Sequence, residues 1–148
     1  MTRSSIKSAV TWGLRLGLGG LLIVASIDKL LHPLEFSFAV AGYGVIGQGG
    51  ALLVAAVLPM LELVTGLLLI SGRWSENAAL AGAMLYTVFL LLVAQAFVRG
   101  IDIECGCYRT EGGGGITWLK VIENSSLAAG AWLLFYLHSV EKERGSRG

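Results

Sequence analysis

Two cysteines, Cys105 and Cys107, are the only ones in this chain of 148 residues, and a single glycine separates them. They lie in the long polar segment between two hydrophobic stretches. A turn could bring the two sulfur atoms together, because Gly106 permits unusual backbone angles, but the resulting disulfide would be strained. A strained disulfide is easier to reduce, so this spacing favours disulfide exchange over a permanent cross-link. We therefore predict that Cys105 and Cys107 are catalytic.

Two other interpretations of the cysteine pair stay open. An inert disulfide would close such a short loop that it would add little stability. Two thiolates also suit soft metals such as copper(I), zinc or mercury, with His32 as a candidate third ligand. A closed metal site needs more ligands than two sulfur atoms provide, so we expect no metal unless His32 or a partner contributes.

The composition predicts the elements that must position the cysteines. Hydrophobic residues make up 55% of the chain and charged residues 14%. The apolar residues gather into runs of about twenty, the length that spans a bilayer as a helix. We predict an all-α integral membrane four-helix bundle that forms one domain over residues 1–148, with spans at about 10–31, 50–70, 77–98 and 116–137. Nothing in the sequence resembles a nucleic-acid-binding motif.

The distribution of basic residues predicts the orientation. Arg15 interrupts the first apolar run, which continues to Leu31, so we expect a retained span rather than a cleaved signal peptide. With four spans, both termini and the turn near residues 72–76 share one side, which holds Arg3, Lys7, Arg73, Lys142, Arg144 and Arg147. The other side holds Lys29, Arg99 and Arg109. This excess places the termini in the cytoplasm and the cysteine loop outside a bacterial inner (plasma) membrane, where disulfides persist.

The first outer loop, residues 32–49, has features of a short helix. Pro33 begins it, and Phe36, Val40 and Tyr43 follow at helical spacing. Such a helix could lie on the outer surface of the membrane, either as a lid or as a plain interfacial connector.

Polar residues inside the predicted spans are the second group of candidates, because an unpaired charge in hydrocarbon is costly. Counted from the inner helix ends, Arg15 and Glu62 fall within about one turn in depth. They could form a structural ion pair, or they could handle protons or substrate. A second group lies nearer the outer side: Asp28, Lys29, Gln95, Lys120, Glu123 and Asn124. It could form a polar pocket beneath the cysteine loop and carry the protons that dithiol oxidation releases.

These motifs resemble the MauE branch of the DoxX-like membrane proteins. The most specific part is the segment from Arg99 to Tyr108, which contains Cys-Gly-Cys and is followed by glycines and Ile-Thr-Trp. Asp28-Lys29-Leu30 resembles the end of the family's first span, and Pro59, Glu62 and Gly66 resemble its second-span pattern. One departure is visible, because Tyr108 and Arg109 stand where the family's motif has Phe-Gly.

The resemblance implies a four-helix redox protein of the kind that supports methylamine dehydrogenase maturation beside a thioredoxin-like partner. The expected activity is that of a thiol–disulfide oxidoreductase. The architecture is also similar to that of the quinone-linked enzymes DsbB and vitamin K epoxide reductase, so quinone is a candidate second substrate. Those enzymes use two cysteine pairs and this chain has one. The alternatives are a protein that binds or transports a soft metal or small thiol, and a non-catalytic assembly subunit.

Overall fold

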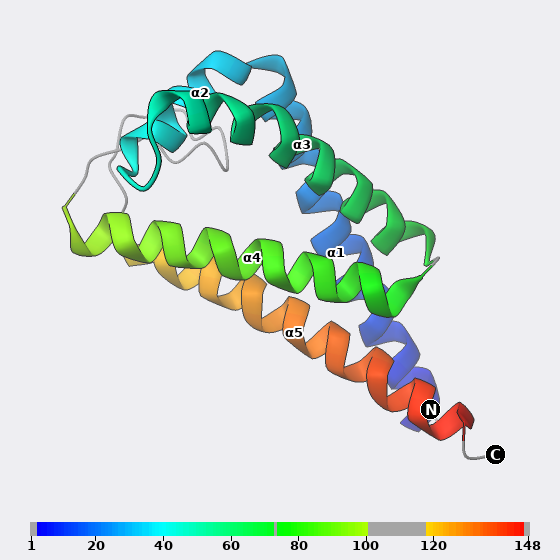
Figure 1. The fold of residues 1–148 in the computed structure, drawn as a ribbon. Coiled ribbons are helices and arrows are strands. Elements are labelled where there is room, and N and C mark those ends of the chain that lie inside the picture. The colour runs from blue at the N-terminus through cyan, green and yellow to red at the C-terminus, as the bar shows by residue number, and fades with distance from the viewer. Residues whose placement is uncertain (1–2, 73, 101–117, 147–148) are drawn as a thin grey trace.

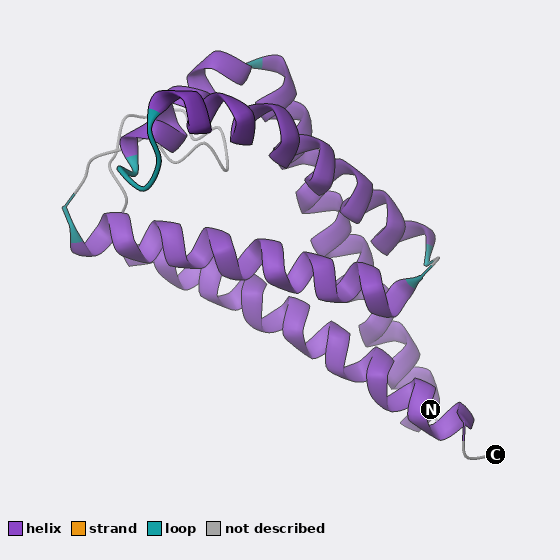
Figure 2. Ribbon diagram, in the orientation of Figure 1, coloured by secondary structure: helices purple, strands orange, loops and turns teal. Residues whose placement is uncertain are grey.

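The computed structural model describes residues 3–72, 74–100 and 118–146, and the regular structure in these ranges is helical (Figures 1 and 2). The helices are α1 (Arg3–Leu31), α2 (Pro33–Gly42), α3 (Gln48–Ser71), α4 (Ser75–Val98) and α5 (Trp118–Ser146). The predicted short helix in the first outer loop is confirmed as α2. Its position at a membrane surface stays a prediction.

Proline and glycine set several of the helix boundaries. Pro33 occupies the first turn of α2, where its missing N–H leaves no bond unmade. Gly72 ends α3 with a left-handed φ of 72°, and its N–H donates to the carbonyl of Leu68 at 3.1 Å. Trp74 follows with a φ of 53°, so two left-handed residues close the tight turn from α3 into α4.

Three helices are long and apolar enough to cross a membrane: Ser8–Leu31, Gln48–Ser71 and Glu76–Val98. These correspond to the first three predicted spans. α5 is as long as α1, with 29 residues each, but it begins and ends with polar stretches. Over the described residues, the structure therefore confirms an all-helical fold with three candidate spans, while the fourth crossing stays a prediction.

The long helices associate as two antiparallel pairs. α1 packs along α3, and α4 packs along α5, whereas contacts between the two pairs are fewer. Figure 1 shows the pairs close together at the end where the chain starts and finishes, and farther apart toward α2. A core of ten buried residues joins them, and five of these are alanines: Leu18, Leu22, Leu69, Ala78, Ala79, Ala83, Tyr86, Ala128, Ala131 and Leu134. Small side chains at the core let helices approach closely in a membrane.

Two glycines set the crossing of α1 and α3. A Cβ atom at Gly19 would lie 2.9 Å from the carbonyl oxygen of Gly66, and one at Gly66 would lie 2.7 Å from that of Gly19. Gly13, Gly17 and Gly20 have no such neighbour within 4 Å. Close backbone approach therefore needs Gly19 and Gly66 alone.

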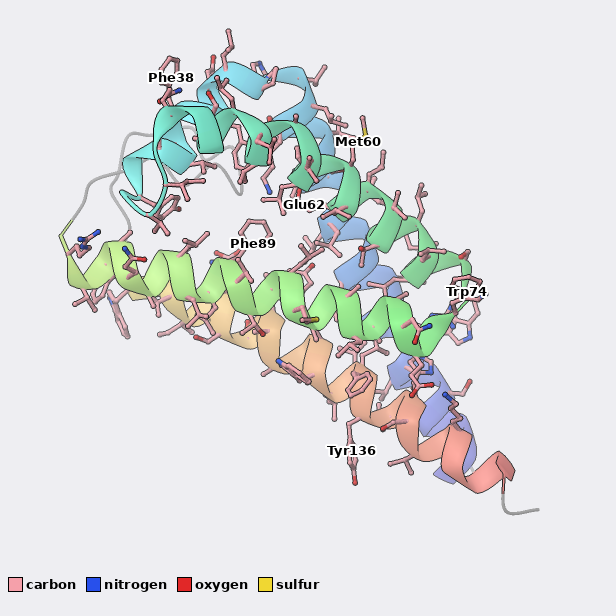
Figure 3. All side chains as sticks on the ribbon, viewed as in Figure 1. Phe38, Met60, Glu62, Trp74, Phe89 and Tyr136 are labelled. Carbon is pink, nitrogen blue, oxygen red and sulfur yellow. The ribbon has the colours of Figure 1, made fainter. Side chains whose placement is uncertain are left out.

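Large apolar side chains cover the outer faces of the helices. Leu53, Leu91 and Tyr136 are each more than half exposed, and Figure 3 shows Phe38, Met60 and Tyr136 pointing away from the other helices. Such continuous apolar exposure suits contact with lipid.

Candidate functional site

A lysine and a glutamate from different helices form a buried ion pair. Lys29 Nζ of α1 donates to Glu62 Oε1 of α3 at 2.5 Å. Their side chains are 1% and 0% exposed. Both residues belong to helices that are apolar enough to span a membrane. Ionisable residues in such positions are rare and are commonly functional.

Two aromatic rings complete the surroundings of the lysine. Lys29 Nζ lies 4.4 Å from the ring centroid of Phe89 in α4 and 5.1 Å from that of Phe36 in α2. The negative faces of aromatic rings attract a cation at these distances. Figure 3 shows Phe89 pointing from α4 toward the side of α3 that carries Glu62. α1, α2, α3 and α4 therefore each contribute one side chain to this site, which we call the Lys29 site.

One oxygen atom of the Lys29 site is left without a donor. Glu62 Oε2 is buried and has no hydrogen-bond partner among the described residues. A buried carboxylate oxygen without a donor costs free energy, because it has lost its water and gained nothing in return. The Lys29 site is thus an incompletely satisfied polar centre in apolar surroundings.

The sequence of α3 presents Glu62 to this centre. Its buried residues follow a spacing of three or four positions, with Thr65 and Gly66 adjacent, and so share one helix face: Ala51, Ala55, Pro59, Glu62, Thr65, Gly66 and Leu69. Pro59 lies inside the helix, one turn before Glu62, where it removes a backbone hydrogen bond. The same face carries Gly66 at the crossing, so the close approach to α1 and the position of Glu62 are set together.

Arg15, which we expected at the depth of Glu62, lies elsewhere. Its Nε donates to the carbonyl of Leu69 at 2.8 Å, and its Nη2 donates to that of Ile70 at 3.3 Å. The guanidinium also lies 4.8 Å from the ring of Trp12. Arg15 therefore satisfies carbonyl groups that the end of α3 leaves without intrahelical partners.

Within the predicted outer polar group, the described contacts of Asp28, Lys29 and Gln95 go to different partners. Gln95 Nε2 and Arg99 Nη1 both approach the carbonyl of Tyr43, at 3.5 and 3.4 Å, and so connect the end of α4 to the end of α2. Asp28 lies near His32, four residues further along the chain, with 3.8 Å between Asp28 Oδ1 and His32 Nδ1. Glu123 is exposed on α5. Lys29 is the member whose described contact is with Glu62.

Cys105 and Cys107 lie outside the described residues, so their catalytic role and the alternative metal site with His32 stay predictions. The segment that carries them joins α4 to α5. Among the residues that the structure describes, no three His, Cys, Asp or Glu side chains gather as a metal site would require.

The sequence patterns do not single out the two aromatic members of the Lys29 site. Phe36 stands out only for its spacing in the first outer loop, and Phe89 is one of many apolar residues in its span. No sequence pattern distinguishes a ring that faces a cation from one that faces lipid. The two rings that face Lys29 are identified only by the packing of the four helices.

The described part of the chain is helical, with three helices apolar enough to span a membrane and a charged pair buried between two of them, which defines a helical membrane protein. Comparison with known proteins gives its family. Residues 7–137 match the family described as methylamine utilisation protein MauE, and the chain belongs to this family.

Three relatives support this assignment, all called methylamine utilization protein MauE. The chain is 34% identical to the protein of Paracoccus denitrificans over 125 residues. These residues make up 84% of this chain and 67% of the Paracoccus denitrificans protein. The chain is 35% identical over 121 residues to that of Paracoccus versutus, covering 81% and 65%, and 34% identical over 126 residues to that of Methylorubrum extorquens, covering 84% and 68%. The chain thus spans about two thirds of the length of these relatives. No solved structure matches it significantly.

Proposed function

We propose that the protein is a membrane thiol–disulfide redox protein in which Cys105 and Cys107 exchange a disulfide with a thioredoxin-fold partner outside the cytoplasm. The observation that carries the proposal is a Cys-Gly-Cys pair, with no other cysteine in the chain, in a member of the MauE family. The relatives are named for methylamine utilisation. We propose that the exchanged disulfides belong to proteins of that process.

The exchange conserves electrons and protons. A thiolate of the reduced protein attacks a sulfur atom of the other protein's disulfide, and a mixed disulfide forms between the two proteins. The second thiolate of the reduced protein then attacks this mixed disulfide and releases the other protein as a dithiol. The disulfide made in one protein equals the disulfide broken in the other. If this chain is the oxidant, a quinone that takes two electrons and two protons could restore its disulfide, and we propose quinone as that second substrate.

The arrangement proposed for the membrane is a single domain with four crossings. α5 packs against α4 and is 29 residues long, which exceeds the length that a crossing needs. The first turns of α1 and the last turns of α5 lie at the same end of the helices (Figure 1). Four crossings with this end in the cytoplasm put the segment of Cys105 and Cys107 on the outer face of a bacterial inner membrane.

Cysteine substitution tests the redox proposal. Cys105→Ser and Cys107→Ser are each expected to abolish exchange, because one thiol can form a mixed disulfide but cannot resolve it. The measurement is the redox state of both thiols in membranes, by alkylation and mass shift, titrated against thiol buffers with and without added quinone. Thr110→Ala, which keeps both thiols, is the matched control.

The same measurement separates the alternatives. A reversible two-electron transition that shifts toward the disulfide when quinone is added supports the proposal, and exchange by a chain without cysteines refutes it. Thiols that stay reduced and become protected from alkylation only by a soft metal would indicate a metal-binding or transport protein. Full biological activity of both cysteine variants would indicate a non-catalytic assembly subunit.

A further inference from the structure

We propose that the Lys29 site binds a proton inside the membrane, and that Glu62 Oε2 is the atom that takes it. The proposal does not rest on the cysteines, because it follows from the described contacts of Lys29 and Glu62 alone.

The burial of the Lys29 site limits the size of the ligand that it admits. The side chains of Lys29 and Glu62 are 1% and 0% exposed. A molecule that reached Glu62 Oε2 would have to displace the packed side chains around it. A proton needs no such space, so it is the ligand that fits the site as built.

Glu62 has one carboxylate oxygen that can take a proton. Glu62 Oε1 accepts from Lys29 Nζ, but Oε2 has no donor among the described residues. Protonation at Oε2 converts the carboxylate into a neutral carboxylic acid, which is far cheaper to bury than an ion with one unpaired oxygen. Oε1 remains available to Lys29 as a neutral acceptor.

Lys29 keeps favourable contacts after its counter-ion is neutralised. A buried ammonium normally depends on its carboxylate, and breaking such a pair is strongly destabilising. Here the Lys29 ammonium also lies over the ring faces of Phe89 and Phe36, at 4.4 and 5.1 Å from their centroids. Because these faces attract the cation whether Glu62 is charged or neutral, the site can gain one proton without losing Lys29.

The other charged groups of the adjoining helices lie outside the site. Asp28 of α1 lies beside His32, and Glu35 of α2 is exposed. On α4, Glu76 pairs with Lys142 of α5 at 2.6 Å, and Arg99 approaches the carbonyl of Tyr43. Lys29 is thus the charged side chain that contacts Glu62 in the described part of the chain, and proton binding depends on this one neighbour.

Infrared spectroscopy of the full chain in lipid vesicles tests the proposal, because a protonated carboxyl group has its own C=O stretching band. We expect a band that grows as the pH is lowered, that shifts when glutamate is labelled with carbon-13, and that is absent in Glu62→Gln. Glu35→Gln, which removes an exposed glutamate from α2, is the matched control and should keep the band.

Two further variants should move the pH at which the Glu62 band appears in opposite directions. Lys29→Met removes the cation that favours the carboxylate, so the Glu62 band should persist to high pH. Phe89→Leu removes one ring face, so Lys29 should depend more on the carboxylate, and the band should appear only at lower pH than in the parent. Circular dichroism checks that each variant keeps its helices.

The proposal is overturned if the parent shows no Glu62-dependent band over the pH range in which it stays folded, since the pair would then be a permanent ion pair. A Glu62 band whose intensity ignores pH would overturn it equally, because the carboxyl group would then be permanently neutral. If Lys29→Met does not fold, the parent and Phe89→Leu still decide between these outcomes.

Discussion

Arg15 and Lys29 are both cations within the apolar part of α1, and the structure uses them differently. Arg15 donates to two backbone carbonyls, which its planar group with several donors can serve together. Lys29 presents a compact charge to one carboxylate oxygen and two ring faces. A lysine at position 15 would therefore not replace Arg15, and an arginine at position 29 would not replace Lys29.

At the residue scale, Gly66→Ala tests the crossing of α1 and α3. The added Cβ would lie 2.7 Å from the carbonyl oxygen of Gly19 and 2.8 Å from a side-chain carbon of Ile23. We expect a loss of stability of roughly 1–3 kcal/mol, because overpacking outweighs the helix-forming gain of alanine, which is about 0.5–1 kcal/mol. The measurement is reversible unfolding in detergent.

Gly20→Ala is the matched control for that experiment. Gly20 lies on α1, next to Gly19, and an added Cβ there would have no neighbour within 4 Å. It should be neutral or slightly stabilising. Equal stability of Gly66→Ala and Gly20→Ala would show that the helices do not cross at these glycines.

At the element scale, Arg15 joins α1 to the end of α3, and Arg15→Met tests this connection. Methionine keeps much of the volume but leaves the carbonyls of Leu69 and Ile70 without these donors. We expect a cost of about 1–3 kcal/mol and faster amide hydrogen exchange in the last turn of α3. Trp12→Leu, which removes the ring near Arg15 but no donor, is the control and should leave exchange in that turn unchanged. Unaltered exchange in Arg15→Met would contradict the connection.

The register of α1 and α3 shows where sequence reasoning reached its limit. The apolar runs predicted the three candidate spans, and Pro33 with the helical spacing that follows it predicted α2, because each of these signals is a property of one segment alone. The predicted depth of Arg15 assumes that the inner ends of the two spans lie level, whereas Arg15 contacts the carbonyls at the end of α3 and α1 extends beyond that end to Arg3. With Gly19 opposite Gly66, a straight antiparallel pair places Ile23 opposite Glu62, about 12 Å from the level of Arg15.

The candidate site was predictable in part for a related reason. Glu62 and Lys29 could be selected from the sequence because charges within apolar spans are conspicuous. Their partnership could not, because Lys29 reaches Glu62 from several residues beyond the level of Ile23. Phe89 could not be selected either, since it becomes part of the site only through the packing of α4 on α3.

At the scale of the whole molecule, the two helix pairs and the basic residues predict a topology that can be measured. In intact cells, a membrane-impermeant maleimide is expected to label reduced Cys105 and Cys107. A reporter that functions only in the cytoplasm should be active when it is fused after Gly148. Labelling that requires permeabilised cells, or a C-terminal reporter outside, would contradict four crossings with cytoplasmic ends. Cys105→Ser combined with Cys107→Ser is the control for labelling, because it removes both thiols of the chain.

The partnership of Lys29 and Glu62 also has a consequence for biogenesis. The two residues are 33 positions apart, so α1 is synthesised well before its counter-ion. A lone charge within the bilayer is costly, up to about 2.5–3.5 kcal/mol at the centre on insertion scales. We expect α1 to wait at the insertion machinery until α3 arrives, so that the two helices enter the lipid as a neutral hairpin. Stalled nascent chains that end between α2 and α3 should then cross-link from α1 to that machinery, and early release of α1 into lipid would refute the expectation.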